Sequence, residues 1–310
     1  MVSAVDLSAS VGAVRLKNPV MPASGTFGFG ADAARLYDIT RLGGAVMKGV
    51  TKEPRFGNDQ PRVTDCPAGM LNAVGLENPG IDSVMKQELP ALARMYKGPI
   101  IANVCGFTVD EYAELAARFD ESQDVAALEI NISCPNVSHG GMAFGTDSVA
   151  AAAVTRAVRR ASGKPIWVKL SPNVTDITRI ARACEDEGAD ALCLINTLLG
   201  MRVDLRTRRP ALANTFGGLS GPCALPVALR MVWQVYEAVR IPIVGMGGVS
   251  SARDAVEMTL AGASAVEIGT AALVDPSALI RVIDELPRVI TEMGYARYAD
   301  LVGKAHQGKG

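Results

Sequence analysis

Eight short stretches of the chain are almost continuously apolar, and each is followed by small residues and then by a helical pattern. Continuous rather than alternating apolar runs are typical of parallel strands that helices cover. The predicted strands are residues 18–25, 45–51, 99–106, 127–134, 165–172, 191–197, 242–249 and 265–271.

Between these runs, apolar residues recur at spacings of three and four, as in helices that pack on a sheet. The clearest predicted helices are residues 82–96, 109–119, 148–161, 176–187, 225–239, 252–261 and 277–290. Strands alternating with helices favour one closed (β/α)8 TIM barrel over residues 1–310. An open doubly wound sheet is the alternative, but no switch point or second domain is evident.

Three further segments extend this barrel. Residues 5–7 and 14–16, on either side of a turn at Gly12, predict an N-terminal hairpin that closes the barrel bottom. Residues 52–99 and 198–224 are too long for plain connections, so we expect insertions after strands two and six. Long insertions after barrel strands usually lie at the catalytic face.

Charge and cysteine content narrow the function classes. The formal net charge is −1, with acids and bases mixed along the chain, which gives no indication of nucleic-acid or membrane-surface binding. No signal-peptide pattern or membrane-spanning run is evident, so a cytoplasmic protein is expected. The six cysteines include no Cys-x-x-Cys pair, so we expect free thiols and no metal site.

Polar side chains interrupt the apolar strands at their carboxyl ends, where the chemistry of barrels is located. They are Lys48, Asn103, Asn131, Lys169 and Asn196 with Thr197. A single asparagine there can simply cap a turn, but three suit a planar ligand with alternating N–H and C=O groups. Because alternate strands share an interior layer, the odd-strand and even-strand sets predict two stacked ligands.

The two lysines need anionic partners, since a buried ammonium is costly without one. For Lys48 and Lys169 the sequence favours a bound ligand. An internal ion pair with Glu129 or Glu267 remains open, because both carboxylates have the strand parity of inward-facing positions.

A phosphate site is predicted after strands seven and eight, the usual location in this fold. Gly247 and Gly248 follow one strand, and Gly269 with Thr270 follows the next, each pair ahead of a predicted helix. Such glycines offer bare backbone N–H groups to an anion. A Rossmann fingerprint is absent, so no NAD site is expected on this chain.

Cys134 ends the fourth predicted strand, within residues 131–136 (NISCPN). A loop thiol with an ordinary pKa of about 8.5 can act as a general base. Most buried free cysteines are only small hydrophobes, so its position at the catalytic face is what singles it out.

Three segments now indicate a family. Residues 131–136 (NISCPN), 72–79 (NAVGLENP) and 48–51 (KGVT) resemble signature segments of class 1 dihydroorotate dehydrogenases, and the resemblance runs along essentially the whole chain. It implies an FMN-dependent oxidation of (S)-dihydroorotate to orotate in pyrimidine (UMP) biosynthesis. By this resemblance, Cys134 takes the C5 proton while C6 gives hydride to FMN. Class 2 relatives carry serine at this position.

The resemblance also implies site residues, position by position. For FMN they are Ser24, Lys48, Asn103, Asn131, Lys169, Ile195, Gly221, Gly247, Gly248, Gly269 and Thr270. For the substrate they are Lys48, Asn72, Ala73, Val74, Gly75, Leu76, Asn131, Asn196 and Thr197.

Residues 137–147 and 196–201 are similar to the B-type of this family. That type implies a partner subunit carrying FAD and a 2Fe–2S cluster, which passes electrons to NAD. It also implies a homodimer of this chain within a heterotetramer. Two alternatives stay open: an FMN barrel like dihydropyrimidine dehydrogenase acting on uracil or thymine, and a non-redox phosphate-binding isomerase or aldolase.

Overall fold

The protein is described by a computed structural model that covers residues 5–133 and 144–308. Eight parallel strands form a nearly closed barrel in the order β3-β16-β15-β10-β9-β8-β7-β4. They are β3 (Val20–Pro22), β4 (Ala45–Val46), β7 (Ile100–Val104), β8 (Val125–Asn131), β9 (Ile166–Lys169), β10 (Ala191–Leu194), β15 (Ile243–Met246) and β16 (Ala263–Ile268). Between the two end strands, the Gly43 N–H donates to the Val20 carbonyl at 2.9 Å. The predicted TIM-like barrel is confirmed.

Each predicted run overlaps one barrel strand, and every strand ends earlier than predicted. After β4 the Met47 N–H still donates to the Ile101 carbonyl of β7, whereas the Lys48 N–H donates to the Gly28 carbonyl, each at 2.9 Å. The residues beyond each strand end therefore form the rim of the barrel.

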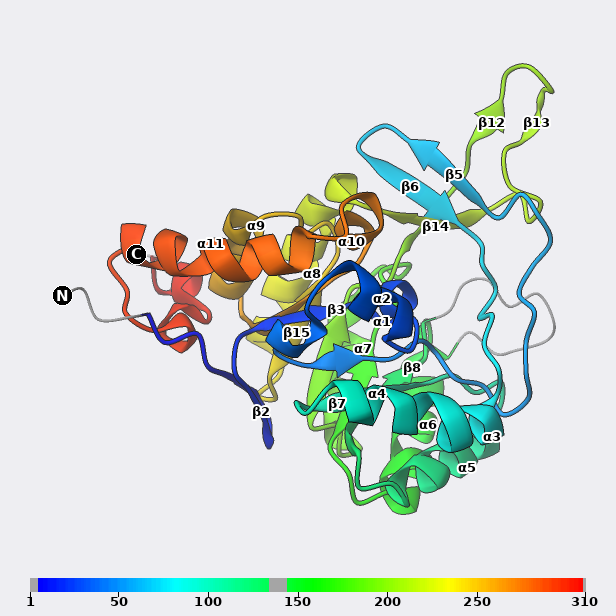
Figure 1. The fold of residues 1–310 in the computed structure, drawn as a ribbon, viewed down its shortest axis with the longest axis horizontal. Helices are drawn as coiled ribbons and strands as arrows, with labels where there is room; N and C mark the ends of the chain where they lie inside the picture. The colour runs from blue at the N-terminus through cyan, green and yellow to red at the C-terminus, as the bar shows by residue number, and fades with distance from the viewer. Residues whose placement is uncertain (1–4, 134–143, 309–310) are drawn as a thin grey trace.

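Helices surround the barrel and bury its outer face (Figure 1). The longer ones are α5 (Val109–Asp120), α6 (Ser148–Ala161), α7 (Ile177–Asp186), α8 (Leu225–Ala238), α9 (Ala252–Leu260) and α11 (Ala278–Glu292). The predicted helix 82–96 is a composite of α3 (Ile81–Ser83), a π-helical turn η2 (Val84–Glu88) and α4 (Leu89–Met95). Short helices α1 (Ser24–Phe27), α2 (Ala31–Leu36) and α10 (Thr270–Val274) were not predicted. None of the described helices is long and apolar enough to cross a membrane.

The N-terminal hairpin consists of β1 (Ala9–Val11) and β2 (Val14–Leu16), joined at Gly12 with a φ of 57°. Its turn lies against the Asp190 carbonyl, which precedes β10, so the hairpin is at the amino-terminal end of the barrel as predicted. The predicted first arm, residues 5–7, was wrong: Asp6 instead bridges to Arg297 near the C-terminus.

The two insertions pair with each other, which the sequence did not predict. Strands β5 (Val63–Cys66) and β6 (Gly69–Asn72) come from the first insertion, and β11 (Leu198–Gly200) and β14 (Gly217–Ser220) come from the second. They form an antiparallel sheet in the order β11-β14-β6-β5, here called the roof sheet. Figure 1 shows it to one side of the barrel, with the hairpin β12 (Val203–Asp204) and β13 (Arg209–Pro210) projecting beyond it.

Candidate active site

A cavity of about 270 Å³ lies between the carboxyl ends of the barrel strands and the roof sheet. Strand-end residues such as Lys48 and Asn131 line one side, and Met70 and Leu219 of the roof sheet line the other. Barrel and insertions therefore enclose one site, at the face where this fold carries its chemistry.

The structure brings nearly all of the predicted site residues into this cavity. The lining includes Ser24, Lys48, Asn72, Val74, Gly75, Leu76, Asn103, Asn131, Lys169, Ile195, Asn196, Thr197, Gly221, Gly247, Gly248, Gly269 and Thr270. Cys134 lies outside the described residues.

Ala73 is the exception among the predicted substrate contacts. It is fully buried in a small cluster with Leu71 and Leu212, and it does not line the cavity. Alternation along the extended chain turns its side chain away from the face that Asn72 and Val74 present. The Ala73 side chain therefore lies behind the residues that line the cavity.

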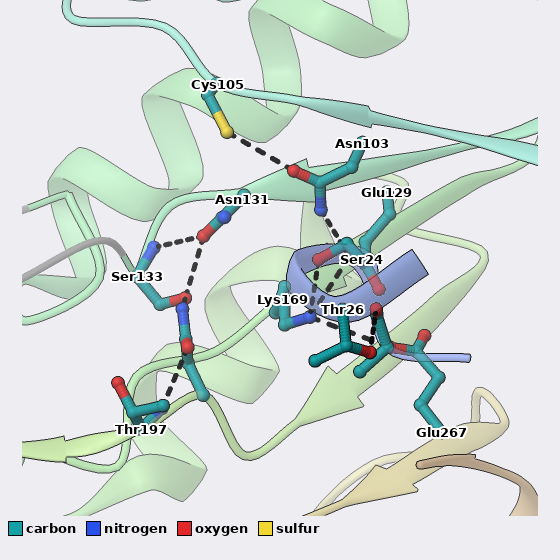
Figure 2. Close-up of polar contacts among 12 residues, drawn as sticks. Ser24, Thr26, Asn103, Cys105, Glu129, Asn131, Ser133, Lys169, Thr197 and Glu267 are labelled. Carbon is teal, nitrogen blue, oxygen red and sulfur yellow. Dashed lines mark hydrogen bonds and ion pairs between the residues drawn. The ribbon is translucent and has the colours of Figure 1, made fainter. Parts of the chain in front are cut away.

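Lys169 stands at the centre of the first of two polar clusters, here called the charged cluster (Figure 2). Its Nζ lies 3.2 Å from Glu129 Oε1, 3.6 Å from Glu267 Oε2 and 3.2 Å from Ser24 Oγ. Asn103 Nδ2 also donates to Glu129 Oε1. The internal ion pair that the sequence left open is thus present, and Lys169 lines the cavity as well.

Burial and charge act against each other in this cluster. Burial opposes a charged lysine, but Glu129 and Glu267 outweigh it and raise the pKa of Lys169. Burial also opposes ionisation of Glu129, yet Lys169 and Asn103 hold the pKa of that carboxyl below its usual range. Lys169 is therefore a cation and Glu129 an anion at neutral pH.

The second cluster, here called the neutral cluster, consists of Asn131, Ser133, Asn196 and Thr197. Figure 2 labels Asn131, Ser133 and Thr197. The Ser133 hydroxyl donates to Asn131 Oδ1 at 2.9 Å and accepts from Asn196 Nδ2 at 2.6 Å. The Thr197 N–H donates to Asn196 Oδ1 at 2.8 Å. Because the protein occupies both amide oxygens, the cluster offers N–H donors to a ligand.

Lys48 belongs to neither cluster. It is half-buried on the cavity wall, and burial lowers its pKa, an effect that Glu77 partly offsets. The adjoining Gly49 is required by packing, since a Cβ there would lie 2.8 Å from Asn103 Oδ1. No carboxylate is within ion-pair distance of Lys48 in the described part of the chain, so its cation is available to an anionic ligand.

Two glycines after β15 form a backbone cradle. Gly247 has a φ of 113° and Gly248 a φ of 86°, and a Cβ on Gly248 would lie 2.6 Å from the Leu225 nitrogen. Neither N–H donates to another backbone group among residues 5–133 and 144–308. By contrast, Asp254 Oδ2 accepts from the N–H groups of Ser250 and Ser251, each at 2.9 Å. The glycine N–H groups therefore remain for an anion.

Several lining residues were not predicted as site residues. They include Thr26, Met70, Ser220, Met246 and Glu267. Met70 and Ser220 reach the cavity only because β6 pairs with β14, and short strands in long insertions carry little sequence signal. Ser220 also accepts a hydrogen bond from Thr270 Oγ1 at 2.8 Å, which joins the roof sheet to the rim of the barrel.

Together, the barrel, its inward lysines and amides and the glycine cradle define an α/β-barrel enzyme with a built site for planar, anionic ligands. The family model described as "Dihydroorotate dehydrogenase" matches residues 6–290. The chain belongs to the dihydroorotate dehydrogenase family.

Two similar relatives carry the name "Dihydroorotate dehydrogenase B (NAD(+)), catalytic subunit". The one from Geobacillus kaustophilus is 52% identical over 96% of this chain and 95% of its own length. The one from Pelobacter propionicus is 54% identical over 96% of this chain and 98% of its own length.

Proposed function

We propose that this chain is the catalytic subunit of an NAD-linked dihydroorotate dehydrogenase, which oxidises dihydroorotate to orotate in pyrimidine biosynthesis. The family match supports the reaction. The observation that carries the proposal on the structural side is the single cavity that gathers two lysines, three strand-end asparagines and the glycine cradle.

The cavity residues fit one FMN. Gly247 and Gly248 suit its phosphate, because their conformation leaves N–H groups free where a Cβ would collide with neighbouring atoms. Ile195 and Met246 provide apolar lining for a flat ring, and Lys169 provides a cation beside it. Bound here, FMN would supply the two-electron acceptor that the oxidation requires.

The neutral cluster suits the pyrimidine ring of the substrate. Its N–H donors match ring carbonyl groups, and the available cation of Lys48 matches the carboxylate. Asn72, the last residue of β6, lines the cavity from the roof sheet. Holding the ring from both sides would orient it for reaction.

We assign the base to Cys134, which would take the C5 proton. Ser133, the last described residue before it, is held by hydrogen bonds with Asn131 and Asn196. Removing a positioned general base usually costs about 10²- to 10⁴-fold in rate.

Anaerobic mixing with dihydroorotate tests this function. Wild-type protein should be yellow and should bleach rapidly. Cys134→Ala should retain FMN and bleach about 10²- to 10⁴-fold more slowly. An undiminished rate would remove Cys134 as the base. Faster bleaching by dihydrouracil would favour the dihydropyrimidine dehydrogenase-like alternative. A colourless protein that cannot be reconstituted would favour the non-redox barrel.

The phrase "catalytic subunit" in the relatives' names indicates a partner chain. We propose that this partner carries FAD and a 2Fe–2S cluster and passes electrons to NAD, within a heterotetramer built on a homodimer of this chain. Purified chain alone should then bleach with dihydroorotate without reducing NAD. Rapid NAD reduction by the isolated chain would contradict this assignment.

A further inference from the structure

Glu129 and Glu267 approach each other inside the barrel from strands on opposite sides, β8 and β16. Both side chains are fully buried beside Lys169 (Figure 2). Oxygens of the two carboxyls and the Cys193 sulfur lie within 4.8 Å of one another. A metal ion is not needed there, because the Lys169 ammonium already provides the cation.

The charges of this group do not balance if every member is in its usual state. Two carboxylates and one ammonium would leave a net negative charge among buried groups, which is costly. Three carboxyl oxygens also lack a hydrogen-bond partner among the described residues: Glu129 Oε2 and both oxygens of Glu267. One proton between the two carboxyls would remove the excess charge and give two of these oxygens a partner.

Hydrogen bonding indicates which carboxyl carries the proton. Glu129 Oε1 accepts from Asn103 and from Lys169, and such bonds favour the ionised form. Glu267 accepts no hydrogen bond from the residues that the structure describes, and it is farther from Lys169, at 3.6 Å. Burial, and then the neighbouring Glu129, raise the pKa of Glu267 well above its usual range.

The other groups that face the pair do not change this assignment. The remaining titratable ones are Lys169 on β9 and Cys193 on β10. Burial raises the pKa of the Cys193 thiol, so it stays neutral. Asn103 on β7 and Ser24 after β3 carry no charge.

We propose that Glu267 is a protonated positioning residue on the cavity floor, which shares one proton with Glu129 and thereby lets Lys169 face the flavin as a compensated cation. The part concerning the flavin rests on the proposed function. Glu267 lines the cavity and Glu129 does not, so the neutral acid borders the ligand and the anion is set behind it.

The protonation state of Glu267 decides whether the cavity floor attracts or repels a negatively charged ligand. With the proton in place, the floor is neutral and Lys169 attracts an electron-rich ligand. When alkaline pH removes the proton, the floor becomes negative and repels it. FMN affinity and the ease of flavin reduction should therefore fall as pH rises through the pKa of Glu267.

Infrared spectroscopy of flavin-free protein tests the proton itself. Wild type should show the carbonyl stretch of a protonated carboxylic acid, shifted in D2O. Glu267→Gln and Glu129→Gln should each lose this band, because the remaining carboxyl then ionises opposite Lys169. A wild-type spectrum without the band, or a band that survives in Glu129→Gln, would overturn the shared proton.

FMN titration across neutral to alkaline pH tests the role. Above the pKa of Glu267, wild type should lose about tenfold in affinity per pH unit relative to Glu267→Gln. Glu267→Asp should restore the pH dependence, and the matched control Cys193→Ala should keep the wild-type profile. Identical profiles for wild type and Glu267→Gln would overturn the role. A protein that binds no FMN at any pH would refute the proposed function, while the infrared result would still decide the proton.

Discussion

The two polar clusters on the cavity wall solve different problems. The charged cluster is almost fully buried, and its members are held by ion pairs across the barrel interior. The neutral cluster is built from amides and hydroxyls that fix one another in a chain of hydrogen bonds. The charged cluster provides electrostatic attraction, whereas the oriented amides of the neutral cluster provide recognition of a ring edge. Removing the partner of a buried charge also costs far more free energy than removing the partner of a buried amide.

The largest effect should come from Lys169→Met, which leaves Glu129 and Glu267 without a cation. The free energy of unfolding should fall by about 3–5 kcal/mol, because unpaired buried charges are strongly destabilising. Urea denaturation measures this. Adding Glu129→Gln to Lys169→Met should recover part of the loss.

Lys52→Met is a matched control for that substitution. It removes a lysine whose ion pair with Glu114, at 2.8 Å, is solvent-exposed. Exposed pairs contribute at most about 1 kcal/mol. Equal destabilisation by both lysine substitutions would show that the buried ion pairs of Lys169 matter no more to stability than an exposed ion pair.

The neutral cluster should respond in activity rather than in stability. Asn196→Ala removes a donor from the cavity wall and should lower kcat/KM for dihydroorotate about 10- to 100-fold, equivalent to about 1–3 kcal/mol. FMN content should stay unchanged. Asn173→Ala is the control, since Asn173 donates to the Thr197 carbonyl from outside the cavity lining. Loss of FMN in Asn196→Ala would show that this cluster holds the flavin instead.

Ser133→Ala should have a smaller effect. The hydroxyl only orients the amides of Asn131 and Asn196, and a typical hydrogen bond contributes about 0.5–1.5 kcal/mol. We expect KM for dihydroorotate to rise several-fold with little change in stability. Steady-state kinetics and thermal denaturation measure the two quantities. An unchanged KM would mean that the amides keep their orientation without the hydroxyl.

Lys48→Arg should have the mildest effect, which is a change in how KM depends on pH. Because burial lowers its pKa, its cation is lost at a lower pH than for a free lysine. KM for the anionic substrate should therefore rise at alkaline pH. Lys48→Arg keeps its charge there, so its KM should stay flat over the same range. Parallel pH profiles for the two proteins would exclude Lys48 as the titrating group.

Much of the barrel could be predicted because its short strands are almost continuously apolar, and the helices between them have a clear period. The positions of Asn103 and Lys169 also followed, since strand ends meet at one face. The ion pairs of Lys169 did not follow, because strand parity alone does not give distances. Ala73 was predicted together with its neighbours, which line the cavity, whereas its own side chain does not.

The roof sheet was missed for a different reason. Its pairing joins Asn72 to Gly218, which are distant in sequence, and no local pattern encodes such a contact. The composite helix beginning at Ile81 shows the opposite case, in which a correct periodicity hides an irregular turn.

The register between β6 and β14 fixes which residues of the two insertions face each other. Adding one residue to either strand would turn every following side chain to the opposite face, moving Asn72 or Ser220 from the cavity side to the side of the buried Leu71 cluster. The insertions must therefore change together during evolution. A chimaera that exchanges only one insertion with that of a distant relative should form the barrel but misalign the strands of the roof sheet.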